Sequence, residues 1–204
     1  MKYFDIKDQL EPLIVFSLQD IFLIDPDFRQ ATLYDWEKAN RVIKLKNNRY
    51  VFADFKPSGL DFYLLSNRLY QPSYVSIESA LNHYGIIPEA VINTTAISTS
   101  KTQVFTTPVG TFWYQSIRPE CFFGYDLLEY KKHGIQLAYL EKAVLDYLYL
   151  HSEIQALSDL ESLRWNKEVL AEQLDKRKLH IFAEAFGSSV LHERLRLLEK
   201  YIIN

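Results

Sequence analysis

The chain has 204 residues, 48% of them apolar and 15% aromatic, which predicts one or two packed domains and excludes a disordered chain. Its net charge of −3 gives no sign that the whole chain binds nucleic acid, so such a function must depend on local charge. The one cysteine, Cys121, excludes an internal disulfide and favours a reducing, cytoplasmic compartment. We find no signal-peptide pattern and no apolar run of about 18 residues, and therefore expect no membrane association.

The first part of the chain is predicted to form three helices. Residues 8–24 have a helical pattern that breaks near Pro12, and Ser17 and Asp20 are placed to cap the segment after the break. Another helix is predicted over residues 28–39. Its inward side is expected to comprise Phe28, Ala31 and Leu33 through Trp36.

Two short strands are predicted next, over residues 41–46 and 49–52, with a tight turn at Asn47-Asn48 because asparagine tolerates positive φ. Three helices followed by a hairpin is the order of a winged helix-turn-helix, in which a helix reads base edges and the hairpin lies along the phosphates. Residues 28–50 contain six basic and two acidic side chains, a local net charge of +4. Such modules also recognise proteins, and lysines protect solvated edge strands, so both interpretations stay open at this point.

A domain boundary is predicted at Pro57-Ser58-Gly59, the clearest linker signal in the chain. We therefore expect a first domain of residues 1–56 and a larger domain of residues 57–204. The segment that follows, GLDFYLLSNRLY, is too apolar for a free tether and is expected to pack on the larger domain.

The larger domain is organised around a short helix within Tyr74–Glu89. Ser76 is expected to cap its amino end, and Gly85, which can adopt the left-handed conformation, is expected to end it. Its apolar stripe consists of Ile77, Ala80, Leu81 and Tyr84.

Strands are predicted over residues 90–97, 102–107 and 110–117, and their spacing suggests an antiparallel meander; residues 135–138 form another short strand. The hydroxyl-rich run at residues 93–102 invites a phosphate-binding role. No Gly-rich cradle accompanies it, however, and threonine favours strands while serine favours turns. We therefore expect a structural role for this run.

A helix over residues 139–150 is predicted to dock on the sheet as an architectural element. Glu141 and Asp146 lie on different faces of it and do not form an acid–base pair, whereas Lys142 and Asp146 form a plain i,i+4 pair.

Residues 153–204 are predicted to be helical, with Asn166 as one cap. One stripe in the last helix is expected to join the core rather than a dimer seam: Leu191, Leu195, Leu198 and Ile202. A second basic cluster is expected to be solvated: Lys176, Arg177, Lys178 and His180.

The chain contains no Gly-rich phosphate loop, no nucleophile elbow and no paired cysteine or histidine at zinc spacing. We therefore expect no catalytic residue, no metal, no cofactor and no enzymatic activity. Together the patterns predict an α+β protein with an N-terminal winged helix-turn-helix, followed by a larger mixed α/β domain with an antiparallel meander and C-terminal helices.

Several ordered blocks of the sequence resemble the AbiEi family of bacterial antitoxins. The blocks are YVSIESALNHYGIIPE, INTTAISTS, FTTPVGTFWYQSI, FFGY and AYLEKAVLDYLYL. The resemblance covers about residues 70–150 well and residues 1–55 in layout only.

This resemblance implies the antitoxin of a type IV toxin–antitoxin system. The first domain would repress the operon by binding inverted repeats in double-stranded promoter DNA. The second would counter a nucleotidyltransferase toxin without requiring a stable complex. On this sequence, groove contacts would fall to Arg29, Gln30, Thr32, Tyr34 and Lys38, and phosphate contacts to Lys44, Lys46, Asn48 and Arg49. Two other classes stay open, a nuclease or other enzyme that a winged helix delivers to nucleic acid, and a protein-interaction adaptor.

Overall fold

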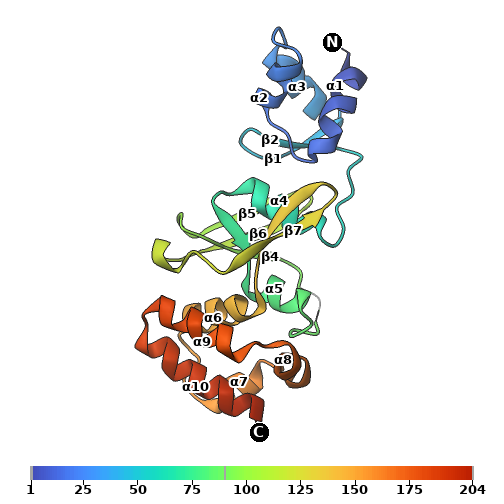
Figure 1. Ribbon diagram of the computed structural model, residues 1–204. Coiled ribbons are helices and arrows are strands. Elements are labelled where there is room, and N and C mark those ends of the chain that lie inside the picture. Colours follow the sequence, from blue (N-terminus) through green and yellow to red (C-terminus); the bar gives the residue numbers. More distant parts are fainter. Residues whose placement is uncertain (1, 90, 204) are drawn as a thin grey trace.

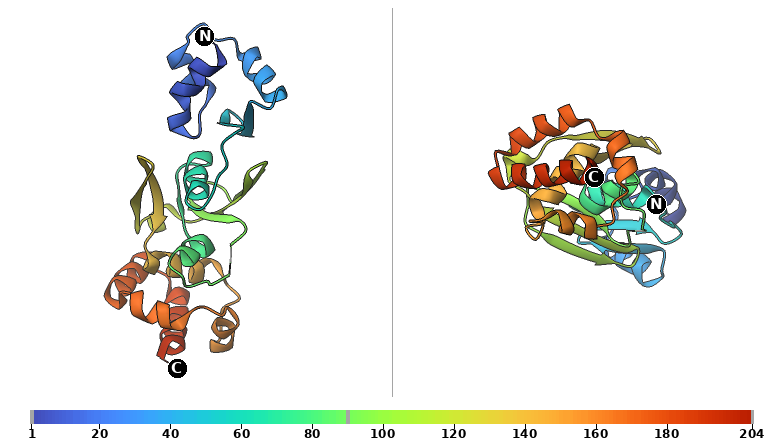
Figure 2. Two further views of the ribbon diagram at one scale, coloured as in Figure 1. Left: turned by 90° about the vertical axis from the view of Figure 1, so that its right-hand side faces the viewer. Right: turned by 90° about the horizontal axis from the view of Figure 1, so that it is seen from below.

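The computed structural model describes residues 2–89 and 91–203 and is elongated, with three tiers (Figure 1). Helices and a hairpin form one end, a six-stranded sheet lies in the middle, and the C-terminal helices form the other end. The two chain ends lie at opposite ends of the molecule (Figure 2). No helix in the described ranges combines the length and the apolar character needed to cross a membrane.

The first tier combines helices with a two-stranded hairpin. Its elements are α1 (Tyr3–Leu10), η1 (Glu11–Leu13), α2 (Leu18–Ile24), α3 (Gln30–Lys38), β1 (Val42–Lys46) and β2 (Arg49–Phe52). Phe16, which lies between α1 and α2, exchanges two backbone hydrogen bonds of 2.9 Å with Tyr50 of β2. The hairpin therefore gains a short third segment from the connection between the first two helices.

Helix α2 begins as predicted. The Ser17 hydroxyl accepts a hydrogen bond from the Asp20 backbone N–H at 3.3 Å, and the Asp20 carboxylate accepts one from the Ser17 backbone N–H at 2.7 Å. Helix α3 buries Leu33 and Trp36 as predicted, but Ala31, Tyr34 and Asp35 are exposed and their expected inward positions are wrong. Because Leu33 and Trp36 define the buried side of the helix, Ala31 faces solvent.

The middle tier is a mixed sheet with the strand order β5-β6-β4-β3-β8-β7. Its strands are β3 (Ser73–Val75), β4 (Thr94–Ser98), β5 (Gln103–Thr107), β6 (Gly110–Ser116), β7 (Tyr125–Tyr130) and β8 (His133–Ala138). The predicted antiparallel meander is wrong, because β6 lies between β4 and β5 and runs parallel to β4, with Ala96 opposite Tyr114. Strand β6 takes the inner position because it buries Phe112 and Tyr114, whereas most side chains of β5 are exposed.

Two strands were missed, and one begins later than predicted. Strand β3 overlaps the stretch assigned to the helix within Tyr74–Glu89, and no element was predicted where β7 lies. Strand β4 begins at Thr94, although the pattern predicted a strand from residue 90, and Ala90 itself lies outside the described residues.

Helices cover both faces of the sheet: α4 (Asp61–Leu69) lies on one face, and α5 (Ile77–His83) and α6 (Leu140–Leu150) lie on the other (Figure 1). Helix α4 packs on β3 and β8, which confirms that the segment after the linker joins the larger part of the chain. Gly85 follows α5 with φ +74°, as predicted. The side-chain cap predicted for Ser76 is wrong, because its hydroxyl donates instead to the Asp146 carboxylate at 2.8 Å.

The third tier is helical as predicted. Its helices are α7 (Leu157–Ser162), α8 (Lys167–Gln173), α9 (Lys176–Phe186) and α10 (Ser189–Ile203), and a short 3-10 turn, η2 (Pro119–Cys121), contacts α9. The Asn166 side chain accepts a hydrogen bond from the Val169 backbone N–H at 3.1 Å, which confirms the predicted cap. The predicted α10 stripe lies in the core, with Leu191, Leu195 and Leu198 buried and Ile202 packed against it.

The first tier meets the sheet through one shared apolar cluster. The cluster comprises Val15, Leu45 and Val51 from the first tier, and Leu65, Leu69, Ala96, Phe112 and Tyr114 from α4 and the sheet. A boundary after residue 56 therefore separates two chain segments that share a buried interface.

Candidate nucleic-acid interface

Helix α3 presents a polar stripe to solvent. Gln30, Tyr34 and Lys38 follow one another at four-residue spacing, and all three are exposed, Tyr34 by 59%. They are exposed because Leu33 and Trp36 occupy the opposite side of the helix and are buried in the first-tier core. The Lys38 ammonium lies 4.5 Å from the centre of the Tyr34 ring, so the cation and the ring form one surface.

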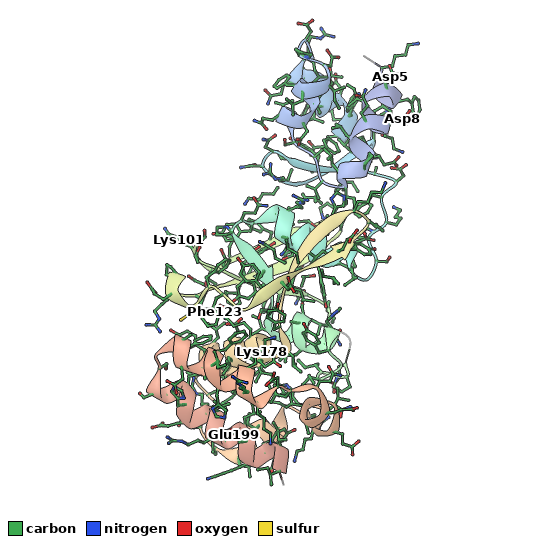
Figure 3. The ribbon with its side chains drawn as sticks, in the orientation of Figure 1. Asp5, Asp8, Lys101, Phe123, Lys178 and Glu199 are labelled. Carbon is green, nitrogen blue, oxygen red and sulfur yellow. The ribbon has the colours of Figure 1, made fainter. Side chains whose placement is uncertain are left out.

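Arg29 stands immediately before α3, exposed, with an extended backbone and no side-chain cap to the helix. Thr32, which was also predicted to face a groove, is only half-exposed. Asp35 and Glu37 lie on α3 itself, and the exposed Asp27 lies just before Arg29, so acids also surround the stripe. Asp5 and Asp8 project outward from α1 (Figure 3). The stripe itself therefore combines one cation, Lys38, with the hydrogen-bonding groups of Gln30 and Tyr34, and Arg29 adds a cation before the helix.

The hairpin contributes fewer free cations than its sequence suggests. Lys44 is exposed, but the strand register shifts between Lys44 and Lys46, and Lys46 turns toward the sheet. Its ammonium donates to the Leu69 carbonyl at 3.2 Å and lies 4.3 Å from the centre of the Phe105 ring. Burial, together with the nearby Arg49, lowers the pKa of Lys46.

Asn48 and Arg49 also contact their own chain. Asn48 has φ +56°, as predicted for the turn, and its side-chain oxygen accepts a hydrogen bond from the Leu18 backbone N–H at 2.9 Å. Its amide also donates to the Gln19 side chain, so Asn48 supports the start of α2. Arg49 donates from Nη1 to the Asn48 carbonyl at 3.0 Å and from Nε to the Arg68 carbonyl at 3.4 Å.

The structure thus brings four predicted groove residues together at one helix, namely Arg29, Gln30, Tyr34 and Lys38. It leaves Lys44 exposed on the hairpin and directs Lys46, Asn48 and Arg49 to contacts within the chain. The alternation of polar and apolar side chains along a short hairpin does not show which face of the hairpin the rest of the chain covers.

A buried polar network in the middle tier was not anticipated. Lys142 and Asp146 on α6 form an ion pair in which both side chains are fully buried. The Asp146 carboxylate also accepts hydrogen bonds from the hydroxyls of Tyr74 at 2.9 Å and Ser76 at 2.8 Å, and the Lys142 ammonium donates to the Tyr74 hydroxyl at 2.8 Å. The predicted i,i+4 pair is therefore confirmed, and it lies in the core rather than on the surface. The apolar residues between the two charges could have indicated that this part of the helix is buried.

Burial lowers the pKa of Lys142 and raises the pKa of Asp146, and their attraction opposes both shifts. Burial also raises the pKa of Tyr74 well above its ordinary value. Every buried side-chain nitrogen and oxygen of the described residues has a hydrogen-bond partner, so the network is complete without a ligand. It joins β3 and the start of α5 to α6.

Glu141 has partners different from those of Asp146, as the sequence predicted. Its carboxylate accepts hydrogen bonds from the Asp175 backbone N–H at 3.0 Å and lies 3.2 Å from the Lys178 ammonium. Lys178, one member of the second basic cluster, lies between the sheet and the C-terminal helices (Figure 3). This cation therefore has a structural partner, whereas its neighbours Lys176 and Arg177 are exposed.

The hydroxyl-rich run is structural, as expected. The Thr95 hydroxyl donates to the Ser76 carbonyl and accepts from the Ser79 backbone N–H, both at 2.9 Å. The Ser98 hydroxyl donates to the Pro72 carbonyl at 2.7 Å. These bonds connect β4 to the segments around α5.

Residues 2–89 and 91–203 contain no group of three or more histidine, cysteine, aspartate or glutamate side chains placed to hold a metal ion. The exposed stripe of α3 offers charge, hydrogen bonding and ring contacts, and it is the candidate site. In comparisons with known proteins, no family model and no curated protein matches this chain.

Proposed function

We propose that this protein binds double-stranded DNA through helix α3 and regulates transcription. The observation that carries the proposal is the exposed stripe of Gln30, Tyr34 and Lys38, with Arg29 at its amino end, on a helix at the end of an elongated molecule. Guanidinium and amide side chains are the groups that read guanine and adenine edges in the major groove. The order of three helices and a hairpin, with the added Phe16–Tyr50 pairing, supports a winged-helix arrangement.

The proposed contact set is smaller than the one expected from sequence. Arg29, Lys38 and Lys44 are its cations, because Lys46 turns toward the sheet and Arg49 lines a hollow at the joint with the sheet. If each of the three cations releases about one counterion, the logarithm of the binding constant should fall with the logarithm of salt concentration at a slope of roughly −3, against about −5 if all five cations took part.

The resemblance to AbiEi antitoxins supplies the biological setting that we propose. In this setting, the regulated DNA is the promoter of the protein's own operon, and the sheet and C-terminal helices counter a nucleotidyltransferase toxin. The resembling blocks lie in β3–α5, β4, β5–β6 and α6, which are the middle tier. The toxin-directed role is therefore proposed for residues 57–204, which contain these blocks, and not for α3.

Fluorescence anisotropy with labelled promoter DNA at several salt concentrations tests the proposal. Arg29→Ala should weaken binding to promoter DNA about tenfold or more while weakening random DNA less, if Arg29 reads a base. Lys46→Gln is the matched control in the same tier and should change affinity less than twofold. Absence of binding at low salt, or an equal loss for Lys46→Gln and Lys38→Gln, would reject the assignment of α3.

The antitoxin role is tested separately, by growth rescue on co-expression with a nucleotidyltransferase toxin from the same operon. A full-length Gln30→Ala/Lys38→Ala variant should lose DNA binding and keep rescue, because the changed residues lie far from the middle tier. Loss of rescue in this variant, with the fold intact, would show that the two roles are not divided between the tiers as we propose.

A further inference from the structure

A hollow of about 310 Å³ lies where the first tier meets the sheet. Four separate chain segments line it: the stretch from Leu13 to Asp20, the start of β2, the end of α4, and the start of β8. Its cationic or potentially cationic groups come from both sides of the joint, Arg49 from the first tier and Arg68 and His133 from the middle tier. Leu13 and Val15 add an apolar wall.

The Arg49 guanidinium is held in place by the backbone. Nε and Nη1 donate to the carbonyls of Arg68 and Asn48, so these bonds fix the plane of the group. No carboxylate of the described residues lies within ion-pair distance of it, and its remaining N–H groups have no partner there. A guanidinium fixed in this way is prepared for an acceptor with two oxygens, because less rotational freedom is lost on binding.

The two other basic groups of the hollow also keep free donors or acceptors. The Arg68 guanidinium has no hydrogen-bond or ion-pair partner in the described ranges, although its backbone carbonyl positions Arg49. The His133 Nε2 lies 2.8 Å from the Pro12 carbonyl, so this nitrogen carries the proton and Nδ1 remains available.

Asp20 is the one acidic group that lines the hollow, and its carboxylate is already engaged. It accepts hydrogen bonds from the Ser17 backbone N–H at 2.7 Å and the Ser17 hydroxyl at 2.6 Å. It lies beyond ion-pair distance of Arg49 and Arg68, so the net positive charge of the hollow is not neutralised by an ion pair within the described residues.

We propose that this hollow binds a small phosphate ester, with the phosphate between Arg49 and Arg68 and the organic part against Leu13 and Val15. Paired guanidinium groups match the geometry of phosphate oxygens better than that of a halide or a single carboxylate. The volume lies at the lower end of the range for small-molecule sites, which fits a ligand the size of a mononucleotide. The inference does not depend on DNA binding by α3, since none of the lining residues belongs to that helix.

Because the basic groups come from both tiers, a bound ester would cross-link them. It would then raise the unfolding temperature as well as occupy the hollow, since a ligand that binds only the folded state stabilises it.

Isothermal titration calorimetry with AMP and with inorganic phosphate on the full chain tests the proposal, together with thermal unfolding. We expect saturable binding of AMP that is tighter than binding of phosphate, and a rise in unfolding temperature. Arg68→Gln should weaken AMP binding about tenfold or more, the effect expected for losing a charge-assisted hydrogen bond. It keeps the backbone carbonyl that holds Arg49, so the unliganded fold should be unchanged.

Arg196→Gln, which changes an exposed arginine on α10, is the matched control and should alter affinity less than twofold. Three outcomes would overturn the proposal: no saturable AMP binding up to about 20 mM, equal AMP affinity for Arg68→Gln and the unchanged protein, or AMP binding no tighter than phosphate. A loss of duplex affinity in Arg68→Gln without any loss of AMP binding would also overturn it, because the hollow would then serve nucleic acid.

Discussion

Replacing Lys142 with methionine would leave the Asp146 carboxylate inside the core without its cation. Both side chains have no exposed surface, so water cannot take the place of the ammonium. The hydroxyls of Tyr74 and Ser76 still donate to the carboxylate, but they do not neutralise its charge. Breaking one side of a buried pair typically costs about 3–5 kcal/mol, a large part of the roughly 5–15 kcal/mol that stabilises a folded domain.

The double variant Lys142→Met/Asp146→Asn separates the charge from the packing. The asparagine oxygen keeps an acceptor for Tyr74 and Ser76, and the methionine keeps most of the volume of the lysine stem. We therefore expect the double variant to recover most of the stability that Lys142→Met loses, because no unpaired charge remains.

The loss in Lys142→Met should depend on pH. Without the lysine, burial raises the folded-state pKa of Asp146 above its unfolded value of about 3.9, so the folded protein binds the proton more tightly. The penalty is therefore smallest near pH 4 and increases with pH, by up to about 1.4 kcal/mol per pH unit, until the raised folded pKa is passed.

Urea unfolding at several pH values measures these free energies. Lys7→Met is the control, since Lys7 has an i,i+4 partner, Glu11 at 3.6 Å, and a second ion pair with Asp54. Both carboxylates are exposed, so about 1 kcal/mol or less is expected for each pair. If Lys142→Met lost no more than Lys7→Met, or if the double variant were less stable than the single one, the reasoning about the buried charge would be refuted.

Two further predictions concern a turn and a histidine. Asn48→Ala should lower the free energy of unfolding, measured in urea, by about 1–2 kcal/mol. It removes the acceptor for the Leu18 N–H and places alanine at φ +56°. An unchanged stability would mean that this contact is not formed in solution. His151 lies between Glu78 and Glu153, whose hydrogen bonds raise its pKa in the folded protein. The contribution of His151 to the stability of the fold should therefore be complete below its unfolded pKa near 6.5 and disappear as pH rises through the higher folded pKa. Unfolding temperatures between pH 5.5 and 8.5 should fall across this window in the unchanged protein and fall less in His151→Gln; parallel curves would contradict the assignment.

Local signals in the sequence predicted the helices well. The caps at Ser17 and Asn166 and the helix end at Gly85 follow from chemistry within a few residues, and all are present in the structure. The order of the strands in the sheet could not be predicted from such local signals. Strand β6 separates β4 from β5 because of the burial of Phe112 and Tyr114 against α4, a contact between distant segments.

The candidate site was predictable along α3 and not along the hairpin. The four-residue spacing from Gln30 to Lys38 is a property of one helix, so the sequence could place these side chains together. Whether Lys46 faces solvent or the sheet depends on where α4 and β5 pack, which no pattern within the hairpin reports. Ser76 shows the same limit, since its hydroxyl prefers a carboxylate seventy residues away over the helix that it precedes.

The apolar cluster between the first tier and the sheet has a practical consequence for anyone who wishes to study the parts in isolation. A fragment that ends near Pro57 would expose Val15, Leu45 and Val51, which are buried in the intact molecule. Such a truncated polypeptide would be prone to self-associate. A weak or irreproducible DNA complex obtained with it would reflect the newly exposed apolar surface and not the properties of α3.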